Sequence, residues 1–489
     1  MKNELTRFLN ETNWQAKIFN GDWVDGASVH AVREPGNGAT LTTVGWAAPS
    51  DVADSAIAAV KAQRAWVALP YQKRAAVFRR AADLLLANRE EIVDWIVRET
   101  GAIAPFAEFQ IENAHTVLEE AAAMPSQSNG VLLPGSDGRL SFARRQPHGV
   151  VGVISPFNVP LVLSMRSVAP ALATGNAVIL KPDPQTPITG GYLLARLFQE
   201  AGLPEGCLHV LPGAADVGEA LVADPRVPMI SFTGSTAVGR RIGEQASRLL
   251  KKVTLELGGK NRLIVLEDAD IDRAVSCAAW GGYLHQGQIC MATGLVLVHE
   301  SIAEEFTRRL AAKADSLPVG DPAGRQVALG PLINERQRDN VASIVRDSVE
   351  QGCKLEAGGS HDGLFFRPTV LSRVRPGTRA FEEEVFGPVL SVATFSNDEE
   401  AIALAAQTEY GLSLGIITQS IGRALEIGNR VPSGLLHIND QTVADEGVNP
   451  FGGRGQSGNG GRHGGHANFD EFTQWQWVTI KDQAPQYPI

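Results

Sequence analysis

The stretch NAVILKPDPQTPITGGYLLARLFQEAGLPEGCLHVLPG, residues 176–213, decides the fold class. Residues 176–182 and 208–213 are short apolar runs that are typical of buried strands, and residues 190–201 between them have helical apolar spacing. The same rhythm extends outward, with strands expected at 150–154, 229–235 and 251–259 and helices at 216–223 and 236–247. Alternating strands and helices predict an α/β fold with a parallel sheet and right-handed crossovers.

The flanking segments extend this pattern on both sides. Helices are expected at 50–69, 72–101 and 107–124, and the first begins with Ser50 as its N-cap. A second α/β series follows, with helices at 272–286, 302–314, 335–351 and 398–406 and strands at 292–299, 387–395, 412–419 and 434–440. The two series predict two domains that meet near Gly258 and Gly259. Alternation around an SDG turn at 136–138 predicts a hairpin, and the alternating segment 472–481 could pair with another chain.

The composition excludes several classes of protein. A length of 489 residues corresponds to about two or three domains, and 44% apolar residues allow a large core. The net charge of −10 and the lack of a basic run argue against a nucleic-acid partner. The four cysteines lie far apart and form no CxxC pair, so neither a zinc site nor a redox dithiol is predicted.

No membrane segment is expected, and the cysteine usage fits a reducing cytoplasm. The first 15 residues are polar and lack the apolar core of a signal peptide. Residues 149–180 carry a single charge, Arg166, and are long enough to span a bilayer. Pro156, Pro160 and Pro170 interrupt this stretch, which is therefore interpreted as a buried strand, turn, helix and strand.

Two residues could carry covalent and acid–base chemistry. Cys290 lies in HQGQICMATG, between an expected helix and an expected strand, and is flanked by Gly287 and Gly294. It could be a nucleophile if its thiolate is stabilised, or a buried structural cysteine. Glu256 ends an apolar strand, where burial should raise its pKa and suit it to general-base catalysis. A structural ion pair is the alternative for Glu256.

Three further features could bind a ligand. Asn158 in SPFNVP follows a buried strand, so its amide could donate to a developing oxyanion or simply occupy a turn. Lys181 ends a strand and could reach a nucleotide hydroxyl or be solvated. In FTGSTAVG, Gly234 permits close backbone approach, and Ser235 with the helix N-terminus could bind a phosphate or form an ordinary turn.

Taken together, the motifs resemble those of the aldehyde dehydrogenase superfamily, in order and over nearly the whole chain. They are PFN at 156–158, KP at 181–182, FTGS at 232–235, LELGGK at 255–260, GQIC at 287–290, EEVFGPV at 383–389 and PFGG at 450–453. Longer stretches, such as SCAAWGGYLHQGQICMATG and the ending EFTQWQW, are similar to bacterial benzaldehyde dehydrogenases. That subgroup oxidises aromatic aldehydes, including hydroxylated and methoxylated ones.

The resemblance implies roles for individual residues. Cys290 matches the nucleophile, Glu256 the general base, and Asn158 with the backbone N–H of Cys290 the oxyanion hole. The implied cofactor is NAD or NADP, with contacts from Ile154, Pro156, Lys181, Asp183, Gly234, Ser235, Glu384 and Phe386. By analogy, the substrate would lie near Arg166, Val159, Asp445 and Phe451. No metal site is predicted.

The resemblance also implies a domain organisation. A Rossmann-like cofactor domain would comprise residues 1–127 and 148–257, and an α/β catalytic domain residues 258–455. A small hairpin with a tail strand, at 128–147 and 468–489, would exchange strands between the subunits of a homodimer or homotetramer.

Four positions depart from the pattern of the wider family. Phe157 replaces a common tryptophan. Pro184 stands where a glutamate often contacts the adenosine ribose, which leaves the choice between NAD and NADP open despite the adjacent Asp183. Leu295 replaces a frequent arginine, which puts the packing of a local loop in doubt. Arg166 replaces an aromatic residue and could bind a ring hydroxyl or an acidic substituent, or form a salt bridge that holds its helix.

The expected activity is therefore the NAD(P)-dependent oxidation of an aromatic aldehyde, such as benzaldehyde or vanillin, to its acid. A thiohemiacetal and then a thioester would form on Cys290, and Glu256 would activate the water that releases the acid. An aliphatic or semialdehyde dehydrogenase of the same fold is the alternative. Intact Cys290, Glu256 and Asn158 disfavour a non-catalytic binding protein, and Glu256 disfavours transfer of the acyl group to coenzyme A.

Overall fold

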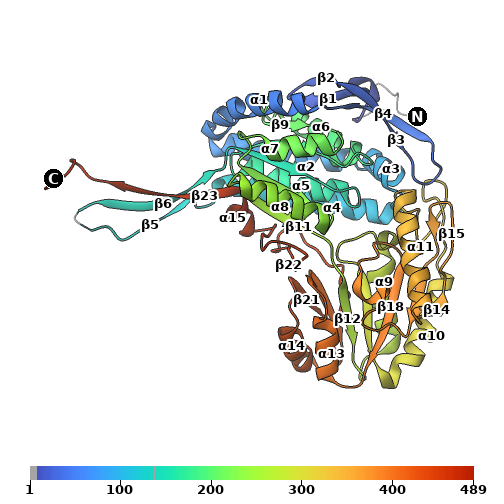
Figure 1. The fold of residues 1–489 in the computed structure, drawn as a ribbon. Helices are drawn as coiled ribbons and strands as arrows, with labels where there is room; N and C mark the ends of the chain where they lie inside the picture. The colour runs from blue at the N-terminus through green and yellow to red at the C-terminus, as the bar shows by residue number, and fades with distance from the viewer. Residues whose placement is uncertain (1–7, 137, 489) are drawn as a thin grey trace.

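Two α/β bodies and a projecting β-arm make up the molecule (Figure 1). The computed structural model describes residues 8–136 and 138–488. Each body is built on a seven-stranded sheet covered by helices. The predicted α/β fold class is confirmed.

The first sheet has the strand order β11-β10-β7-β8-β9-β1-β2. Its strands are β7 (Val150–Ile154), β8 (Ala177–Lys181), β9 (Leu208–Val210), β10 (Met229–Thr233), β11 (Lys252–Glu256), β1 (Lys17–Asn20) and β2 (Trp23–Asp25). β7 to β11 are parallel, as predicted, whereas β1 and β2 add an antiparallel edge. The sequence pattern did not reveal the N-terminal strands, because they are short and, in the β3–β4 hairpin (Ser28–Arg33 and Thr40–Trp46), mostly exposed or half-buried.

Helices cover both faces of this sheet. They are α1 (Pro49–Ala68), α2 (Tyr71–Ala87), α3 (Arg89–Thr100), α4 (Ala104–Ala123), α5 (Pro160–Ala173), α6 (Leu193–Ala201), α7 (Ala215–Ala223) and α8 (Thr236–Arg248), with a π-helical turn at Ile188–Tyr192.

Two expectations about these helices are wrong, one on the start of α1 and one on the length of the next helix. The N-cap of α1 is Ala48, because Asp51 accepts the Ala48 backbone N–H at 2.7 Å, so Ser50 lies inside the helix. The single helix expected at 72–101 is interrupted at Asn88, whose side chain bonds the Leu84 carbonyl at 2.7 Å.

The strand order creates a crevice at the carboxyl ends of β7 and β10. β8 and β9 lie on one side of β7, and β10 and β11 lie on the other side, so the chain reverses its direction of winding there. In open parallel sheets, ligands bind at such a switch point. Ile154 and Gly234 lie at this edge, because Phe232 of β10 pairs with Ile154 of β7.

The second sheet has the order β14-β17-β18-β13-β12-β20-β21. Its strands are β12 (Asn261–Val265), β13 (Thr293–His299), β14 (Lys354–Ala357), β17 (Thr369–Ser372), β18 (Val389–Phe395), β20 (Ser413–Ile417) and β21 (Leu435–Ile438). All neighbours are parallel except β14 and β17. Helices α9 (Ile271–Tyr283), α10 (Glu300–Ser316), α11 (Glu335–Glu350), α12 (Arg379–Glu382), α13 (Asp398–Ala406) and α14 (Ile421–Arg430) connect the strands. Two short pairs, β15 (His361–Asp362) with β16 (Phe365–Phe366) and β19 (Tyr410–Gly411) with β22 (Arg454–Gly455), complete this body.

The apolar stretch before residue 180 belongs to the core of the first body. Helix α5 is buried along its whole length, between α4 and the sheet. Its composition therefore reflects burial inside the protein. Within the described part of the chain, no helix is long and apolar enough to cross a membrane.

The arm is a three-stranded sheet of order β23-β6-β5, which extends away from both bodies (Figure 1). The predicted hairpin forms β5 (Gly130–Leu132) and β6 (Leu140–Pro147), although Asp137 of its SDG turn lies outside the described residues. The tail strand β23 (Thr473–Ile480) follows α15 (Ala467–Phe472) and pairs with β6 of the same chain. Its other edge has no strand partner among the described residues. Leu132 and Trp477 on the arm are largely exposed.

Candidate active site

Cys290 lies on a loop with an unusual backbone, between α9 and β13. The loop begins with a tight turn at Leu284–Gly287, in which His285, Gln286 and Gly287 have φ values of 49°, 58° and 67°. A Cβ atom on Gly287 would lie 2.3 Å from the carbonyl oxygen of Gly387. The glycine therefore permits close contact between the GQIC and EEVFGPV segments.

Asn261 and Gly259, at and just before the start of β12, hold the backbone of this loop in place. The Asn261 side-chain amide donates to the carbonyl oxygens of Cys290 and Ala292, at 2.8 Å and 2.9 Å. Gly259 packs against the same loop, since a Cβ atom there would lie 2.5 Å from the Cys290 carbonyl oxygen. The LELGGK motif thus supports the backbone on which the sulfur is carried.

Asn158 reaches the Cys290 loop from the other side. Its side-chain nitrogen donates to the carbonyl oxygen of Gln288 at 2.9 Å, which fixes the amide beside the thiol. An amide nitrogen has two N–H donors, so one remains for an oxygen in the adjoining cavity. The turn that holds Asn158 ends at Pro160, the first residue of the buried helix α5.

A single apolar cavity brings Asn158 and Cys290 together. Its walls carry aromatic and aliphatic side chains from α4, α5, the cysteine loop and the segment before the PFGG motif. The lining residues are Phe106, Phe109, Asn158, Val159, Val162, Leu163, Arg166, Ile289, Cys290, Met291, Val443, Asp445 and Phe451. The sequence-based substrate residues Val159, Arg166, Asp445 and Phe451 therefore lie around the thiol.

Arg166 is already engaged within this cavity. Its guanidinium forms an ion pair with Asp445, and the two side chains are 7% and 11% exposed. The same guanidinium lies 4.4 Å from the centre of the Phe451 ring, a cation–π contact. The salt bridge considered for Arg166 is therefore present, and it joins α5 to the segment that forms the opposite wall.

The environment of Cys290 disfavours its thiolate. Burial raises the pKa of the Cys290 thiol to about 12, and the nearby carboxylate of Glu384 acts in the same direction. Arg166 opposes the increase, and Glu256 adds to it. The thiol is therefore protonated at neutral pH, contrary to the stabilised thiolate that the sequence argument required, and its activation needs a base.

Glu256, the predicted base, is a buried carboxyl group. It ends β11, is 3% exposed, and neither carboxylate oxygen has a hydrogen-bond partner among the described residues. Burial raises its pKa well above the usual value, while Arg166 and Arg462 act against the increase. The ion pair considered as an alternative is absent from the described contacts. An unpaired buried carboxyl group of this kind suits general-base chemistry.

The glycine-rich run at 452–465 packs along the strand that carries Glu256. Gly458 forms a bridge with Glu256, and the Leu257 backbone N–H donates to the Ser457 carbonyl at 3.0 Å. A Cβ atom on Gly458 would lie 2.8 Å from the Leu255 carbonyl oxygen. The glycines therefore allow a second backbone to run directly beside the end of β11 that carries Glu256.

The carboxyl edge of the first sheet forms a second cavity, between α7 and α8. Ile154 and Lys181, at the ends of β7 and β8, line it together with Ala215, Gly218, Glu219, Val222, Val238, Arg241, Ile242 and Gln245. Gly234 and Ser235 stand just before α8, and the Gly234 N–H donates to the Glu256 carbonyl at 3.0 Å. The side chain of Ser235 does not cap α8, so the first N–H groups of this helix remain available for a phosphate.

These features fit a dinucleotide, but of the contacts predicted at this edge only Ile154 and Lys181 line the cavity, and Gly234 and Ser235 stand beside it. Asp183 accepts the Gln185 backbone N–H at 2.9 Å, and neither Asp183 nor Pro156 lines the cavity. Burial lowers the pKa of Lys181, an effect that Asp183 and Asp216 oppose. Among the described residues its Nζ forms one hydrogen bond, to the Pro182 carbonyl oxygen at 3.2 Å.

Glu384 and Phe386 do not line the cavity that holds Asn158 and Cys290. They line a narrow space with Gly259, Gly287, Ile289 and Thr293. Glu384 accepts the Gly259 N–H at 3.0 Å, and burial raises its pKa to about 7. The Phe386 ring meets Phe157 edge-on at 5.9 Å, so Phe157 forms the aromatic contact at the PFN position. Gln337 of α11 holds the Phe386 carbonyl at 2.8 Å.

The presence of Leu295 was expected to affect the packing of a loop, and this expectation is wrong. Leu295 lies within β13, is fully buried, and pairs with Arg262 of β12 and Ser391 of β18. The leucine packs in the core of the second body, among residues such as Leu297 and Phe381.

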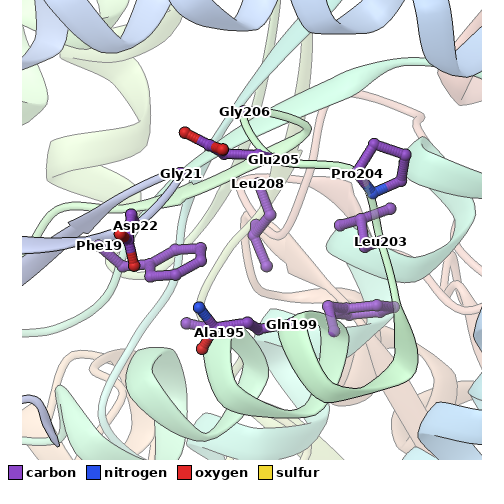
Figure 2. A pocket seen from close by; sticks show the side chains of 11 residues that line it. Phe19, Gly21, Asp22, Ala195, Gln199, Leu203, Pro204, Glu205, Gly206 and Leu208 are labelled. Atoms are coloured by element: carbon purple, nitrogen blue, oxygen red, sulfur yellow. The ribbon is translucent and has the colours of Figure 1, made fainter.

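A further cavity lies away from these residues and is shown in Figure 2. It is formed by β1, α6 and the turn before β9, and its lining includes Phe19, Asp22, Gln199 and Glu205. Among its lining residues there is no cysteine, lysine, arginine or histidine. No group of three or more potential metal ligands occurs in the described part of the chain.

Several residues of the site were not identified from the sequence. Asn261 was missed, although its position directly after LELGGK is a signal that could have been used. Phe106 and Phe109 line the substrate cavity from one face of α4, and their i, i+3 spacing marks that face. Arg241 and Val443 carry no sequence signal, because only the folding of the chain brings them to their cavities.

Comparison with known proteins agrees with this geometry. The model of the aldehyde dehydrogenase family matches residues 23–478. A vanillin dehydrogenase of Amycolatopsis sp. is 54% identical over 99% of this chain and all of its own length. The benzaldehyde dehydrogenase [NAD(+)] of Pseudomonas putida is 49% identical, over 97% of this chain and 98% of its own.

Solved structures show the same architecture. Betaine aldehyde dehydrogenase from Staphylococcus aureus, in complex with NAD+, superposes with a TM-score of 0.94 at 30% identity, and the match covers 98% of this chain and 97% of that one. Succinate-semialdehyde dehydrogenase from Burkholderia pseudomallei gives a TM-score of 0.93 at 34% identity, over 96% of this chain and 98% of that one. The chain belongs to the aldehyde dehydrogenase family and is an oxidoreductase that acts on aldehydes.

Proposed function

We propose that this enzyme oxidises aromatic aldehydes to carboxylic acids with NAD or NADP, through a thioester on Cys290. One observation carries the substrate class: the cavity that holds Cys290 and Asn158 is walled by Phe106, Phe109, Phe451 and aliphatic side chains. Flat aromatic rings gain from both apolar burial and ring–ring contact in such a space. The names of the vanillin and benzaldehyde dehydrogenase relatives support the same substrate class.

The ion pair between Arg166 and Asp445 disfavours a semialdehyde substrate. A semialdehyde carries a carboxylate that needs an available cation in a buried site. Arg166 is the cation in the lining of the substrate cavity, and Asp445 already neutralises it. Binding a second carboxylate there would require this buried pair to break, which is strongly unfavourable.

The first steps of the proposed reaction take place at Cys290. Glu256 takes the thiol proton, and the sulfur attacks the aldehyde carbon to give a thiohemiacetal. The free N–H of Asn158 and the Cys290 backbone N–H donate to the oxyanion, and one such donor contributes about 3–4 kcal/mol to transition-state stabilisation. A nicotinamide held beside Cys290 would supply the acceptor for the hydride that leaves the same carbon as the thioester forms.

The protein then completes the reaction by hydrolysis. The proton taken from the thiol first passes from Glu256 to solvent. Glu256 then removes a proton from water, the hydroxide attacks the thioester carbon, and the intermediate collapses to the carboxylic acid and the Cys290 thiolate, to which Glu256 returns the proton. Lys181, Gly234, Ser235 and the first N–H groups of α8 would hold the dinucleotide at the sheet edge, and Glu384 and Phe386 would hold its nicotinamide end.

The domain organisation follows the same proposal. Residues 1–127 and 148–257 bind the cofactor, residues 258–455 form the catalytic domain, and the arm at 128–147 and 468–489 joins subunits into a homodimer or homotetramer. The free edge of β23 and the exposed Leu132 and Trp477 support the role of the arm. The four cysteines are free, which fits the proposed cytoplasmic location.

A panel of aldehydes tests the proposal. Reduction of NAD and of NADP is followed at 340 nm with benzaldehyde, vanillin, hexanal and succinate semialdehyde, with and without coenzyme A. We expect kcat/KM for the aromatic aldehydes to exceed that for the others by at least about tenfold, since an aromatic contact contributes about 1 kcal/mol beyond its buried area. Higher values for hexanal or the semialdehyde, or a dependence on coenzyme A, would contradict it.

A further inference from the structure

A turn of the glycine-rich run lies beside the end of β11 that carries Glu256. Gly458 in this turn forms a bridge with Glu256. Arg462 closes the turn, since its Nη1 atom donates to the carbonyl oxygens of Gly453 and Gly461, at 3.0 Å and 2.7 Å. The guanidinium of Arg462 therefore fixes the backbone that runs beside the predicted base.

Arg462 also brings a positive charge to this place. Its side chain is half-buried and forms no ion pair within the described part of the chain. Arg166 is the other cation that acts on Glu256, but it is already paired with Asp445. Of the two cations, Arg462 is thus the one whose charge is not balanced by a bonded carboxylate.

The ionisation of Glu256 responds to this charge. Burial raises the pKa of the Glu256 carboxyl group well above its usual value, and Arg166 and Arg462 oppose the increase. Glu471 on α15 adds to the increase, and the Gly453 backbone N–H acts against it. Removal of the positive charge from the turn would therefore leave Glu256 harder to ionise.

The other titratable groups around Glu256 do not replace this charge. Cys290 interacts electrostatically with Glu256, but burial raises the pKa of its thiol to about 12, so it is uncharged at neutral pH. His463, the next residue of the glycine-rich run, is buried, and burial lowers its pKa to about 3. The imidazole is therefore also uncharged near neutral pH.

Glu471 connects the arginine to α15 and opposes its effect. The Glu471 carboxylate accepts the Arg462 backbone N–H at 3.2 Å and lies 3.5 Å from the Nζ atom of Lys252. We propose that Arg462 is a positioning residue for Glu256: its guanidinium holds the turn beside the carboxyl group, and its charge, opposed by Glu471, increases the share of this base that is ionised. The inference rests on the proposed role of Glu256 and adds the residue that sets how readily that base acts.

The pH dependence of a single turnover tests this inference. With enzyme in excess over benzaldehyde and NAD present, the rate constant of benzoate formation excludes release of the reduced cofactor. It is measured by acid quench from about pH 5 to pH 10 for the wild type, Arg462→Gln, Arg462→Lys and Arg454→Gln. Arg454 is exposed in the same glycine-rich run, so Arg454→Gln removes an equal charge away from the base.

The expected signature is a shift of the profile along the pH axis. In Arg462→Gln the midpoint of the acidic limb should rise by about one pH unit, so that the rate constant is about tenfold lower below the midpoint and unchanged on the alkaline plateau. Arg462→Lys should keep the wild-type midpoint, because it retains the charge. Arg454→Gln should match the wild type at every pH.

Other results would overturn the inference. A rate constant that fell by the same factor at every pH in Arg462→Gln would show that the arginine only supports the fold, and an unchanged profile would show that it does not act on Glu256. If thermal melting shows that Arg462→Gln does not fold, Glu471→Gln decides. Removal of this opposing carboxylate should lower the midpoint, and an unchanged midpoint would overturn the inference.

Failure of the underlying function gives a different result. If the wild-type enzyme formed no benzoate, or if Glu256→Gln kept the wild-type pH profile, the proposed reaction itself would fail, whatever the effect of Arg462→Gln.

Discussion

The side chain of Asn261 donates a hydrogen bond to the carbonyl oxygen of Cys290 at 2.8 Å. A second bond from the same nitrogen reaches Ala292 at 2.9 Å, and its Oδ1 accepts the Ser413 backbone N–H at 2.9 Å. One side chain on β12 therefore connects the loop of the nucleophile to β20. This link holds the backbone of the loop that carries the sulfur.

Replacement of Asn261 should impair catalysis more than folding. Asn261→Ala leaves two carbonyl oxygens and one N–H without partners, at about 1–3 kcal/mol for each buried group. We expect kcat to fall about 10- to 100-fold, as a displaced nucleophile loses its attack geometry. Steady-state kinetics and thermal melting measure the two effects. Asn340→Ala, on the exposed side of α11, is the control, and a folded Asn261→Ala with wild-type kcat would contradict the role.

Gly287 should be intolerant of a side chain for steric reasons. A Cβ atom there would meet the Gly387 carbonyl oxygen at 2.3 Å, so Gly287→Ala should force the two active-site segments apart. Gly363→Ala is a matched control, because Gly363 also has a positive φ, of 54°, but its Cβ would meet no atom within 4 Å. We expect Gly363→Ala to cost about 1 kcal/mol of stability, and Gly287→Ala to cost more and to lose activity. If Gly287→Ala and Gly363→Ala had equal effects on the melting temperature and on kcat/KM, the contact between Gly287 and Gly387 would be unimportant.

The reactivity of Cys290 should report its raised pKa. Only the thiolate is alkylated, and burial and the Glu384 carboxylate raise the pKa of the thiol to about 12. In the free enzyme the rate of alkylation by iodoacetamide should therefore rise about tenfold per pH unit between pH 7 and 9. Glu384→Gln removes a negative charge and should accelerate the reaction at each pH. Peptide mass spectrometry assigns the modified cysteine, and a plateau below pH 9 would refute the raised pKa.

Glu99 should make stability depend on pH. Its buried carboxyl group accepts the Ile188 and Thr189 backbone N–H groups at 2.7 Å and 2.8 Å, and burial raises its pKa to about 7. The folded state thus holds this proton more tightly than the unfolded chain, so the associated stabilisation is complete below about pH 4.5 and is lost as the pH rises through 7. In urea unfolding, the free energy of unfolding of the wild type should exceed that of Glu99→Gln by an amount that falls by roughly 1–3 kcal/mol between pH 5 and 8. An advantage that grew over this range would reverse the assignment.

Much of the fold could be predicted because local sequence and global structure agree. The strands β7 to β11 are short apolar runs, and each is separated from the next by a helix with a clear apolar face. The exposed hairpin β3–β4 and the antiparallel edge β1–β2 were missed, since their side chains alternate only weakly. The N-cap of α1 was misplaced because Asp51 bonds the backbone of Ala48 and Ser50 bonds nothing there.

Residues of the candidate site could be predicted where the reactive side chain lies within a sequence motif. Cys290, Glu256 and Asn158 were identified from their loops and strand ends, and Asn158 and Cys290 share one cavity. Their electrostatic states were not predictable from single positions, because the pKa of Cys290 is raised by burial and by Glu384, almost a hundred residues away in the chain. The pairing of Arg166 with Asp445 likewise depends on the tertiary structure, and so does the position of Arg241 in its cavity.

The central claim is that the acyl group passes through Cys290 and that Glu256 releases it. Glu256→Gln is mixed with benzaldehyde and NAD, quenched with acid, and examined by intact-protein and peptide mass spectrometry. Because Glu256 also takes the thiol proton, the account predicts that one equivalent of NADH forms more slowly than in the wild type and that a benzoyl group then stays bound to Cys290. Multiple rapid turnovers without an adduct, or a benzoyl group on Cys207, Cys277 or Cys353, would contradict it.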